Sequence, residues 1–230
     1  MKKIKLFSIV AAFVAAFAFT SCNTGDDNNS NYQPLTKAEK DLCYLKTAGV
    51  HNGKLAYMSD ENVTEIKGTK EYIDTLDVAT DIYGNGKDTV MTVRNFPVKI
   101  LARYIPENAD TKDLKDALKK YEMPVNFKSV VTYYTVTPVL QFLLYPETMT
   151  VNLEYGGTTH KVNFYCLANT YYYIYNTGLV DSKTSKLETY FALYGYEVDP
   201  KDEKNPKPTV FSYKIAGKPY TGAQIKFFEP

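Results

Sequence analysis

Residues that could carry out catalysis are few in this chain. The two histidines, His51 and His160, are not spaced with another histidine or a cysteine as metal ligands are. No G-x-S-x-G motif marks a nucleophilic serine. Cys166 with a histidine would form a thiol nucleophile, but it continues the alternation of Val162 and Phe164, which favours a buried thiol. Paired carboxylates for glycoside hydrolysis would come from distant segments, and no pair stands out. The sequence predicts no catalytic residue, cofactor or metal site.

One acidic cluster resembles a calcium loop only superficially. Asp81 lies just before a glycine-rich stretch at 84–88, and Asn85 and Asp88 lie within it. Their spacing is not that of an EF-hand loop, and no bidentate glutamate follows. Glycine and asparagine accept the positive φ that hairpin turns need. We therefore interpret 84–88 as a hairpin turn.

Tyrosine is unusually abundant, with 21 residues against no tryptophan. A tyrosine with a buried ring and a hydroxyl at the rim is ordinary strand material, and this is the interpretation we favour. The alternative is a recognition surface, because tyrosine offers contact area and a polar tip at low entropy cost. That surface would consist of the outward-facing members of a set of four, namely Tyr172, Tyr190, Tyr194 and Tyr196.

Strands dominate the pattern. Met149, Val151 and Leu153 alternate with polar residues, which predicts a strand with one buried face. Similar runs predict further strands at 75–83, 89–101, 139–145, 148–155, 158–168, 170–175, 186–198, 209–215 and 223–228. A first strand begins at Gly49. Because the strands follow one another closely and hairpin turns join them, we expect a mostly antiparallel sheet.

Two short helices interrupt the strands. Thr36 and Glu39 form a capping box for a helix at 35–48, and Ala38, Leu42 and Leu45 give it an apolar face. The second helix begins after a capping Asp110 and ends before Pro124. Its apolar stripe contains Leu114, Ala117, Leu118 and Tyr121, while Lys115, Lys119 and Lys120 are expected to face water.

These elements predict an α+β fold with one β-rich domain at 35–230. We favour a β-sandwich or curled sheet with two short helices. The alternative is a lipocalin-like barrel, a family whose first strand also begins with a glycine and an aromatic residue. That resemblance implies a tryptophan in the first strand, and this chain has none.

The N-terminus predicts export. Lys2, Lys3 and Lys5 precede an apolar run at 6–19 that is too short for a permanent membrane anchor. The run ends in Phe19-Thr20-Ser21-Cys22, which resembles a bacterial lipoprotein signal. The resemblance implies removal of residues 1–21 and acylation of Cys22, for example with palmitate. Acyl chains would attach the protein to a membrane without a transmembrane helix. An ordinary secretory signal is the alternative.

A polar segment at 22–34 would be a flexible tether after the lipidated Cys22. Its Asp26-Asp27 pair resembles the export tag of Bacteroidetes-type lipoproteins, which implies the outer face of the outer membrane. The periplasmic face is the alternative. The pattern Gly49, His51, Gly53, Leu55 resembles the opening strand of uncharacterised Bacteroidetes surface lipoproteins, with histidine where tyrosine is expected. This resemblance implies a domain of unknown function.

The net charge bears on binding partners, and the cysteine content bears on the disulfide state. A net charge of +1 and a pI near 7.6 leave no basic excess for nucleic acid. With Cys22 acylated, Cys43 and Cys166 could form one disulfide or remain two buried thiols, and both states stay open.

The function we expect is that of a membrane-anchored, non-catalytic binding or accessory module at the cell surface, with a protein, glycan or small molecule as ligand. One alternative is a structural component of the envelope or of a pilus, which would pair an edge strand with another chain. A second is an unrecognised hydrolase.

Overall fold

The computed structural model describes residues 34–66, 69–84, 88–170, 173–181, 183–215 and 217–230, without the side chains of 60–72. The predicted signal peptide, Cys22, nearly all of the tether and Tyr172 lie outside these residues. Thr36–Pro230 form one compact unit, and it is this unit that we describe. Among the described residues, no helix combines the length and apolar character needed to cross a membrane.

Within the described residues the elements are mostly strands. Three short helices accompany them: α2 (Lys37–Thr47), the 3-10 helix η1 (Val98–Tyr104) and α3 (Lys112–Lys119). The strands are β1 (Gly49–Ile66), β2 (Thr69–Gly84), β3 (Thr89–Arg94), β4 (Phe127–Thr135), β5 (Leu140–Pro146), β6 (Met149–Tyr155), β7 (Thr158–Cys166), β8 (Thr177–Val180), β9 (Leu187–Val198), β10 (Thr209–Val210), β11 (Ser212–Ile215), β12 (Lys218–Thr221) and β13 (Ala223–Phe228).

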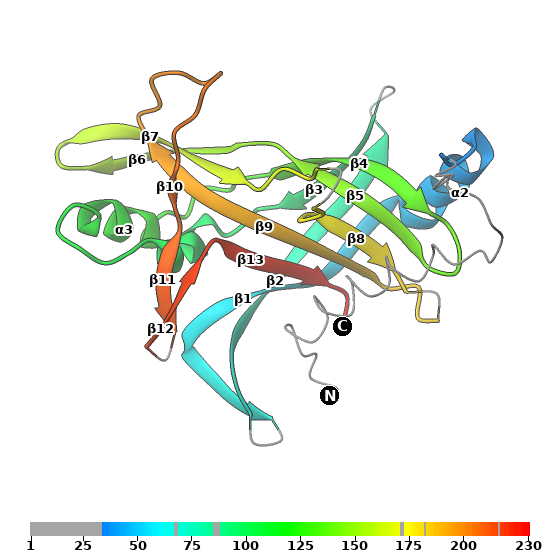
Figure 1. Ribbon diagram of the computed structural model, residues 1–230, viewed down its shortest axis with the longest axis horizontal. Helices are drawn as coiled ribbons and strands as arrows, with labels where there is room; N and C mark the ends of the chain where they lie inside the picture. Colours follow the sequence, from blue (N-terminus) through cyan, green and yellow to red (C-terminus); the bar gives the residue numbers. More distant parts are fainter. Residues whose placement is uncertain (1–33, 67–68, 85–87, 171–172, 182, 216) are drawn as a thin grey trace, which may run out of the picture. The chain divides into compact units, whose positions relative to one another are not determined.

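Eight strands close into a ring. The order is β13-β1-β2-β3-β4-β5-β8-β9, and β13 also pairs with β9. Every pairing is antiparallel. The C-terminal half of β9 pairs with β7, and β7 pairs with β6. Strands β11 and β12 form a separate hairpin (Figure 1). The predicted mostly antiparallel class is confirmed, and the sheet curls until it closes, as in the barrel alternative.

Aromatic side chains fill the inside of this ring. The register places Leu55, Phe227 and Thr189 on one face, and Phe142 opposite Gly178 on the same face. A Cβ atom at Gly178 would overlap the Phe142 ring, and one at Gly53 would overlap Phe227. The glycines therefore provide the room that these rings occupy. An eight-stranded barrel is just wide enough for side chains to fill it.

Helix α2 closes one end of the barrel. The predicted capping box is present, with Thr36 N donating to Glu39 Oε2 at 2.8 Å. The predicted apolar face is wrong, because Leu45 is 75% exposed and α2 buries Cys43 and Thr47 instead. Hydrogen bonds explain this orientation: the Thr47 hydroxyl lies 2.5 Å from Tyr133 Oη, and the Gly84 amide donates to the Tyr44 hydroxyl at 3.1 Å.

Helices η1 and α3 lie at the opposite end (Figure 1). The predicted strand at 89–101 is wrong in its second half, since β3 ends at Arg94 and η1 begins at Val98. In α3 the buried residues Leu114 and Leu118 agree with the predicted stripe. Asp110 does not cap this helix. The N-cap is Thr111, and the Asn108 side chain accepts hydrogen bonds from the amides of both residues.

The predicted strand at 170–175 is also wrong. Described residues 173–175 form a loop, and two asparagine side chains replace the ladder beside β5 and β9. The Asn169 amide donates to Leu144 O at 2.9 Å, and Asn176 Oδ1 accepts from Ala192 N at 2.9 Å. Because side chains satisfy these strand groups, the segment between β7 and β8 need not be extended.

Candidate anion-binding cleft

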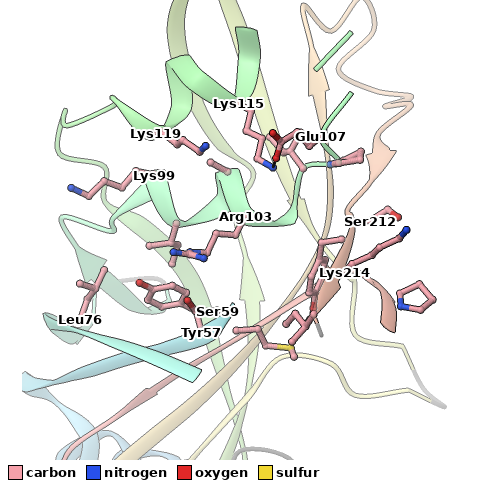
Figure 2. Close-up of a pocket in the computed structure, with 18 residues that line it drawn as sticks. Tyr57, Ser59, Leu76, Lys99, Arg103, Glu107, Lys115, Lys119, Ser212 and Lys214 are labelled. Atoms are coloured by element: carbon pink, nitrogen blue, oxygen red, sulfur yellow. Dashed lines mark hydrogen bonds and ion pairs between the residues drawn. The ribbon is translucent and has the colours of Figure 1, made fainter. Parts of the chain in front are cut away.

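A cleft of about 750 Å³ opens at the η1 end of the barrel. Its lining comes from β1, β2, η1, the loop after η1, α3 and the β11–β12 hairpin (Figure 2). The lining residues include Tyr57, Met58, Ser59, Lys99, Arg103, Glu107, Lys115, Lys119, Ser212, Tyr213, Lys214 and Ile215. Segments far apart in sequence therefore meet at this cleft.

Two helices each direct a pair of basic residues to the cleft. In η1 the buried side chains Leu101 and Tyr104 face the barrel, and Lys99 and Arg103 line the cleft. The Tyr104 hydroxyl accepts a hydrogen bond from Met58 N at 3.1 Å, which attaches η1 to β1. In α3, Leu114 and Leu118 are buried, and the next residues, Lys115 and Lys119, line the cleft. Both basic pairs have a spacing of four residues.

The β11–β12 hairpin forms another wall. Tyr213 stacks on its cross-strand partner Tyr220 at 5.7 Å and packs edge-on against Tyr104 at 4.9 Å. Its hydroxyl lies 3.3 Å from the Met58 sulfur, and burial raises the pKa of Tyr213 to about 12. These contacts hold the hairpin against η1 and β1, so that Lys214 is presented at the cleft.

The cleft is strongly basic although the whole chain is nearly neutral. Among the described side chains that line it, five are cations, Lys99, Arg103, Lys115, Lys119 and Lys214, and one is a carboxylate, Glu107. Lys115 Nζ lies 3.2 Å from Glu107 Oε2. Among the side chains that the structure describes, Lys99, Lys119 and Lys214 have no ion-pair partner. A concave surface lined by charges of one sign attracts an oppositely charged ligand.

The pKa of Glu107 reflects the positive charge around it. The hydrogen bond from Lys115 lowers the pKa of Glu107, and the charges of Lys115, Lys119 and Lys112 lower it further. The carboxylate is therefore favoured as an anion at this position. The cleft can hold negative charge while Tyr213 and Ile215 offer apolar surface beside it.

The histidines do not meet each other or a cysteine thiol in a catalytic arrangement. His51 is bonded to Thr47 O at 2.8 Å and lies 3.2 Å from Glu229 Oε1, at the α2 end. His160 Nδ1 lies 2.7 Å from Asp199 Oδ2, and its ring stacks on Tyr155 at 4.1 Å. Both described cysteines, Cys43 and Cys166, are free thiols, and burial raises the pKa of Cys166 to about 12.

The four predicted surface tyrosines do not form one surface. Tyr172 lies outside the described residues. Tyr190 is half-buried and donates to Glu188 Oε2 at 3.0 Å, and Tyr194 is also half-buried. Tyr196 does not face outward: it is 4% exposed and packs on Phe211 at 5.7 Å. The reason is that the chain beyond β10 places the Phe211 ring over this face of β9.

The exposed tyrosines of this region lie instead on the loop before β8. Tyr173 is 63% exposed and Tyr175 is 36% exposed, and their rings stack at 6.1 Å. The sequence prediction had placed both residues in a strand. Their loop is fixed by the Asn169 side chain, whose Oδ1 accepts from the Tyr175 amide at 2.8 Å.

The cleft was not predicted from the sequence, because the lysines of α3 were expected to be exposed to solvent. Lys115 is only 13% exposed in its side chain and pairs with Glu107, so its expected exposure is wrong. The four-residue spacing of Lys99 and Arg103 was a usable signal for a second basic helix. The strand interpretation of 89–101 concealed it, since Val98 and Ile100 resemble strand residues.

Comparison with known proteins gives a family but no activity. Neither the curated proteins nor the solved structures contain a significant match to this chain. A family model described as "Domain of unknown function (DUF4840)" matches residues 46–198, more than half of the 230 residues. The match includes η1 and α3 but not the β11–β12 hairpin or β13, which closes the ring. The chain therefore belongs to the DUF4840 family.

Proposed function

We propose that this protein is a lipid-anchored, non-catalytic binding module that captures an acidic ligand in the cleft at the η1 end of the barrel. The observation that carries the proposal is the charge of the cleft: among the described side chains that line its volume of about 750 Å³, five are cations and one is a carboxylate. Ligand sites are typically concave and mostly preformed, with a few convergent polar groups. The aromatic rings that fill the barrel favour this cleft over the barrel interior.

The anchored location is part of the same proposal. The lipoprotein-like Cys22, the polar tether and the Asp26-Asp27 pair support an acylated protein on the outer face of the outer membrane of a Bacteroidetes-type bacterium. A surface position suits capture of an acidic glycan or small molecule from the medium. The periplasmic face is the alternative location.

The anchor is tested by mass spectrometry of the protein from native membranes. We expect an N-terminal peptide that begins at an acylated Cys22, and we expect Cys22→Ser to release the protein into the soluble fraction. Protease treatment of intact cells then separates the two faces, because only protein on the exterior is degraded. An unmodified first cysteine would refute the anchor and leave the cleft proposal standing.

Binding is tested by calorimetric titration of the mature chain, using acidic, sulfated and neutral oligosaccharides as probes. We expect acidic probes to bind, with an affinity that falls as salt rises. Lys119→Ala combined with Lys214→Ala should weaken binding. Lys128→Ala is the matched control, since Lys128 is exposed on β4 and is not among the lining residues. Equal losses in both variants would argue against the cleft.

A second candidate is an envelope assembly component, and the edge strand β6 favours it. In the described part of the chain β6 ends the sheet order and pairs with β7 alone. Exposed strand edges accept a strand from another chain. Asn152→Pro in β6 should abolish assembly if this edge is used, with no effect on titration of the cleft. A mature chain that stays monomeric at all concentrations and in native membranes would argue against this candidate.

A further inference from the structure

The carboxylate of Glu107 and the amine of Lys115 differ sharply in exposure. The Lys115 side chain is 13% exposed, whereas that of Glu107 is 81% exposed. Lys115 extends from α3, which Leu114 and Leu118 fix to the body of the protein. Glu107 belongs to the loop between η1 and α3. The ion pair therefore joins a fixed, largely buried cation to a solvent-exposed anion (Figure 2).

The position of the Glu107 carboxylate is favourable for negative charge. Lys115 donates to it at 3.2 Å, and the charges of Lys119 and Lys112 also act on it. Their combined effect keeps the pKa of Glu107 below its usual range. Glu107 is the exposed partner of the pair, so water can solvate its carboxylate once it leaves Lys115. An incoming anion can therefore replace Glu107 without a large penalty.

We propose that the Glu107 carboxylate occupies the subsite for the acidic group of the ligand, and that the ligand displaces it from Lys115. The inference rests on the proposed function and narrows it. Lys115 is the anchor, Lys119 the second cation, and Lys214 on the opposite wall holds a further acidic or polar group. Since the group in the subsite is a carboxylate, the ligand class is a carboxylate-bearing molecule rather than a sulfate or phosphate ester.

The body of the ligand is a sugar ring. Ser212, Tyr213 and Lys214 of β11 are all among the residues that line the cleft. Hydroxyl, aromatic and ammonium groups in one wall suit a polyhydroxylated ring that carries an acid. A volume of about 750 Å³ is within the range of pockets for small ligands. The ligand is accordingly a short uronic-acid oligosaccharide.

The decisive experiment is titration of Glu107→Gln with digalacturonic acid. Removal of the internal competitor should raise the affinity roughly threefold to fivefold, the range that an exposed ion pair corresponds to. Glu122→Gln is the matched control, because Glu122 is an exposed carboxylate just after α3 and is not among the lining residues. Its affinity change reports the general effect of removing one negative charge. An unchanged or weaker affinity in Glu107→Gln, relative to this control, overturns the inference.

Two further measurements separate this inference from the proposed function. Lys115→Met should abolish digalacturonic acid binding, while thermal unfolding shows that the variant folds. The carboxyl carbon of Glu107, followed by NMR, should titrate closer to its ordinary pKa when the cleft is saturated. If wild-type protein binds digalacturonic acid and the Glu107 titration does not move, the subsite is wrong and the cleft proposal stands. If no acidic oligosaccharide binds wild type or Glu107→Gln, the proposed function fails too. Tighter binding of sulfated or phosphorylated sugars, or of an acidic peptide, overturns the ligand class alone.

Discussion

The two ends of the barrel handle polar groups in opposite ways. At the α2 end, hydroxyl, amide and imidazole groups are paired within the chain, as in the contacts of Thr47 with Tyr133, Tyr44 with Gly84, and His51 with Glu229. At the η1 end, the described side chains around an open cleft include five cations and one carboxylate. One closed sheet thus carries an end whose polar groups satisfy each other and an end with a surplus of one charge. This surplus is the reason why we propose a ligand site at the η1 end.

Two lysines make the same contrast in finer detail. Lys226 on β13 is 1% exposed, lies 2.7 Å from Glu188 and is covered by the Tyr190 and Phe228 rings at 5.0 and 5.5 Å. Lys115 is also largely buried, but its carboxylate partner is exposed. Burial of a lysine does not by itself mark a site. The counterion of Lys115 is more exposed than that of Lys226, and our proposal assigns a binding role to Lys115 on this difference.

The largest effect should come from removing the counterion of Lys226. Glu188→Ala leaves a buried ammonium without a partner and should cost about 3 kcal/mol of unfolding free energy. Urea unfolding measures this loss. Glu188→Ala combined with Lys226→Met should recover most of it, because no buried charge remains. A loss below about 0.5 kcal/mol, the range of ordinary surface substitutions, would mean that the pair is not buried in solution.

The same pair predicts a pH dependence. Burial lowers the pKa of Lys226 in the folded protein below its ordinary value of 10.5. Between the folded pKa and 10.5 the unfolded chain binds more protons, so the contribution of this group to stability rises with pH. Unfolding of wild type and Lys226→Met should be compared from pH 8 upward, and the rise should be absent from Lys226→Met. Parallel pH profiles would contradict the lowered pKa.

The α2 end should lose stability without any change in binding. Thr47→Val removes the partner of the buried Tyr133 hydroxyl and should cost about 1 to 3 kcal/mol. Affinity for acidic oligosaccharides should stay that of wild type, because the cleft lies at the other end. Denaturation and calorimetry on one preparation test both halves. A change in affinity would show that the two ends are coupled.

The η1 end should show the reverse behaviour. Lys119→Ala should lower the affinity for acidic ligands roughly threefold to tenfold. Since Lys119 is exposed and has no ion-pair partner among the described side chains, unfolding free energy should change by less than about 0.5 kcal/mol. A destabilised Lys119→Ala with unaltered affinity would assign this lysine to structure.

The smallest effect concerns the cap of α2. Hydrogen bonds from the Thr36 side chain and backbone lower the pKa of Glu39 below its ordinary value of 4.5. The stabilisation of α2 by the Glu39 carboxylate is therefore complete above pH 4.5, and it is lost as pH falls through the pKa of Glu39 in the folded protein. The protection factors of the α2 amides against hydrogen exchange should fall in that acid range, and Glu39→Gln should remove this fall. Acid-dependent exchange that persists in Glu39→Gln would place its cause elsewhere.

Local patterns predicted those elements whose own residues specify them. The alternation of Met149, Val151 and Leu153 gave β6 almost to the residue, and the Thr36 capping box placed the start of α2. Local patterns gave a wrong prediction at 98–104, where a segment that contains the β-branched residues Val98 and Ile100 forms η1 at the barrel end. They failed again after β7, where Asn169 and Asn176 replace the ladder that a strand would supply. In both places contacts from distant strands decide the conformation.

The sequence by itself determined the antiparallel strands, the helix cap and the mostly β class, because alternation, turn residues and capping act over a few neighbouring positions. Only the tertiary structure decided that the sheet closes and that Lys226 lies beside Glu188, while Lys99, Lys119 and Lys214 have no ion-pair partner among the described side chains. The role of a lysine depends on whether a carboxylate from elsewhere in the chain reaches it. Glu188 reaches Lys226 across paired strands, whereas Glu107 is the one carboxylate among the described residues that line the cleft at the other end.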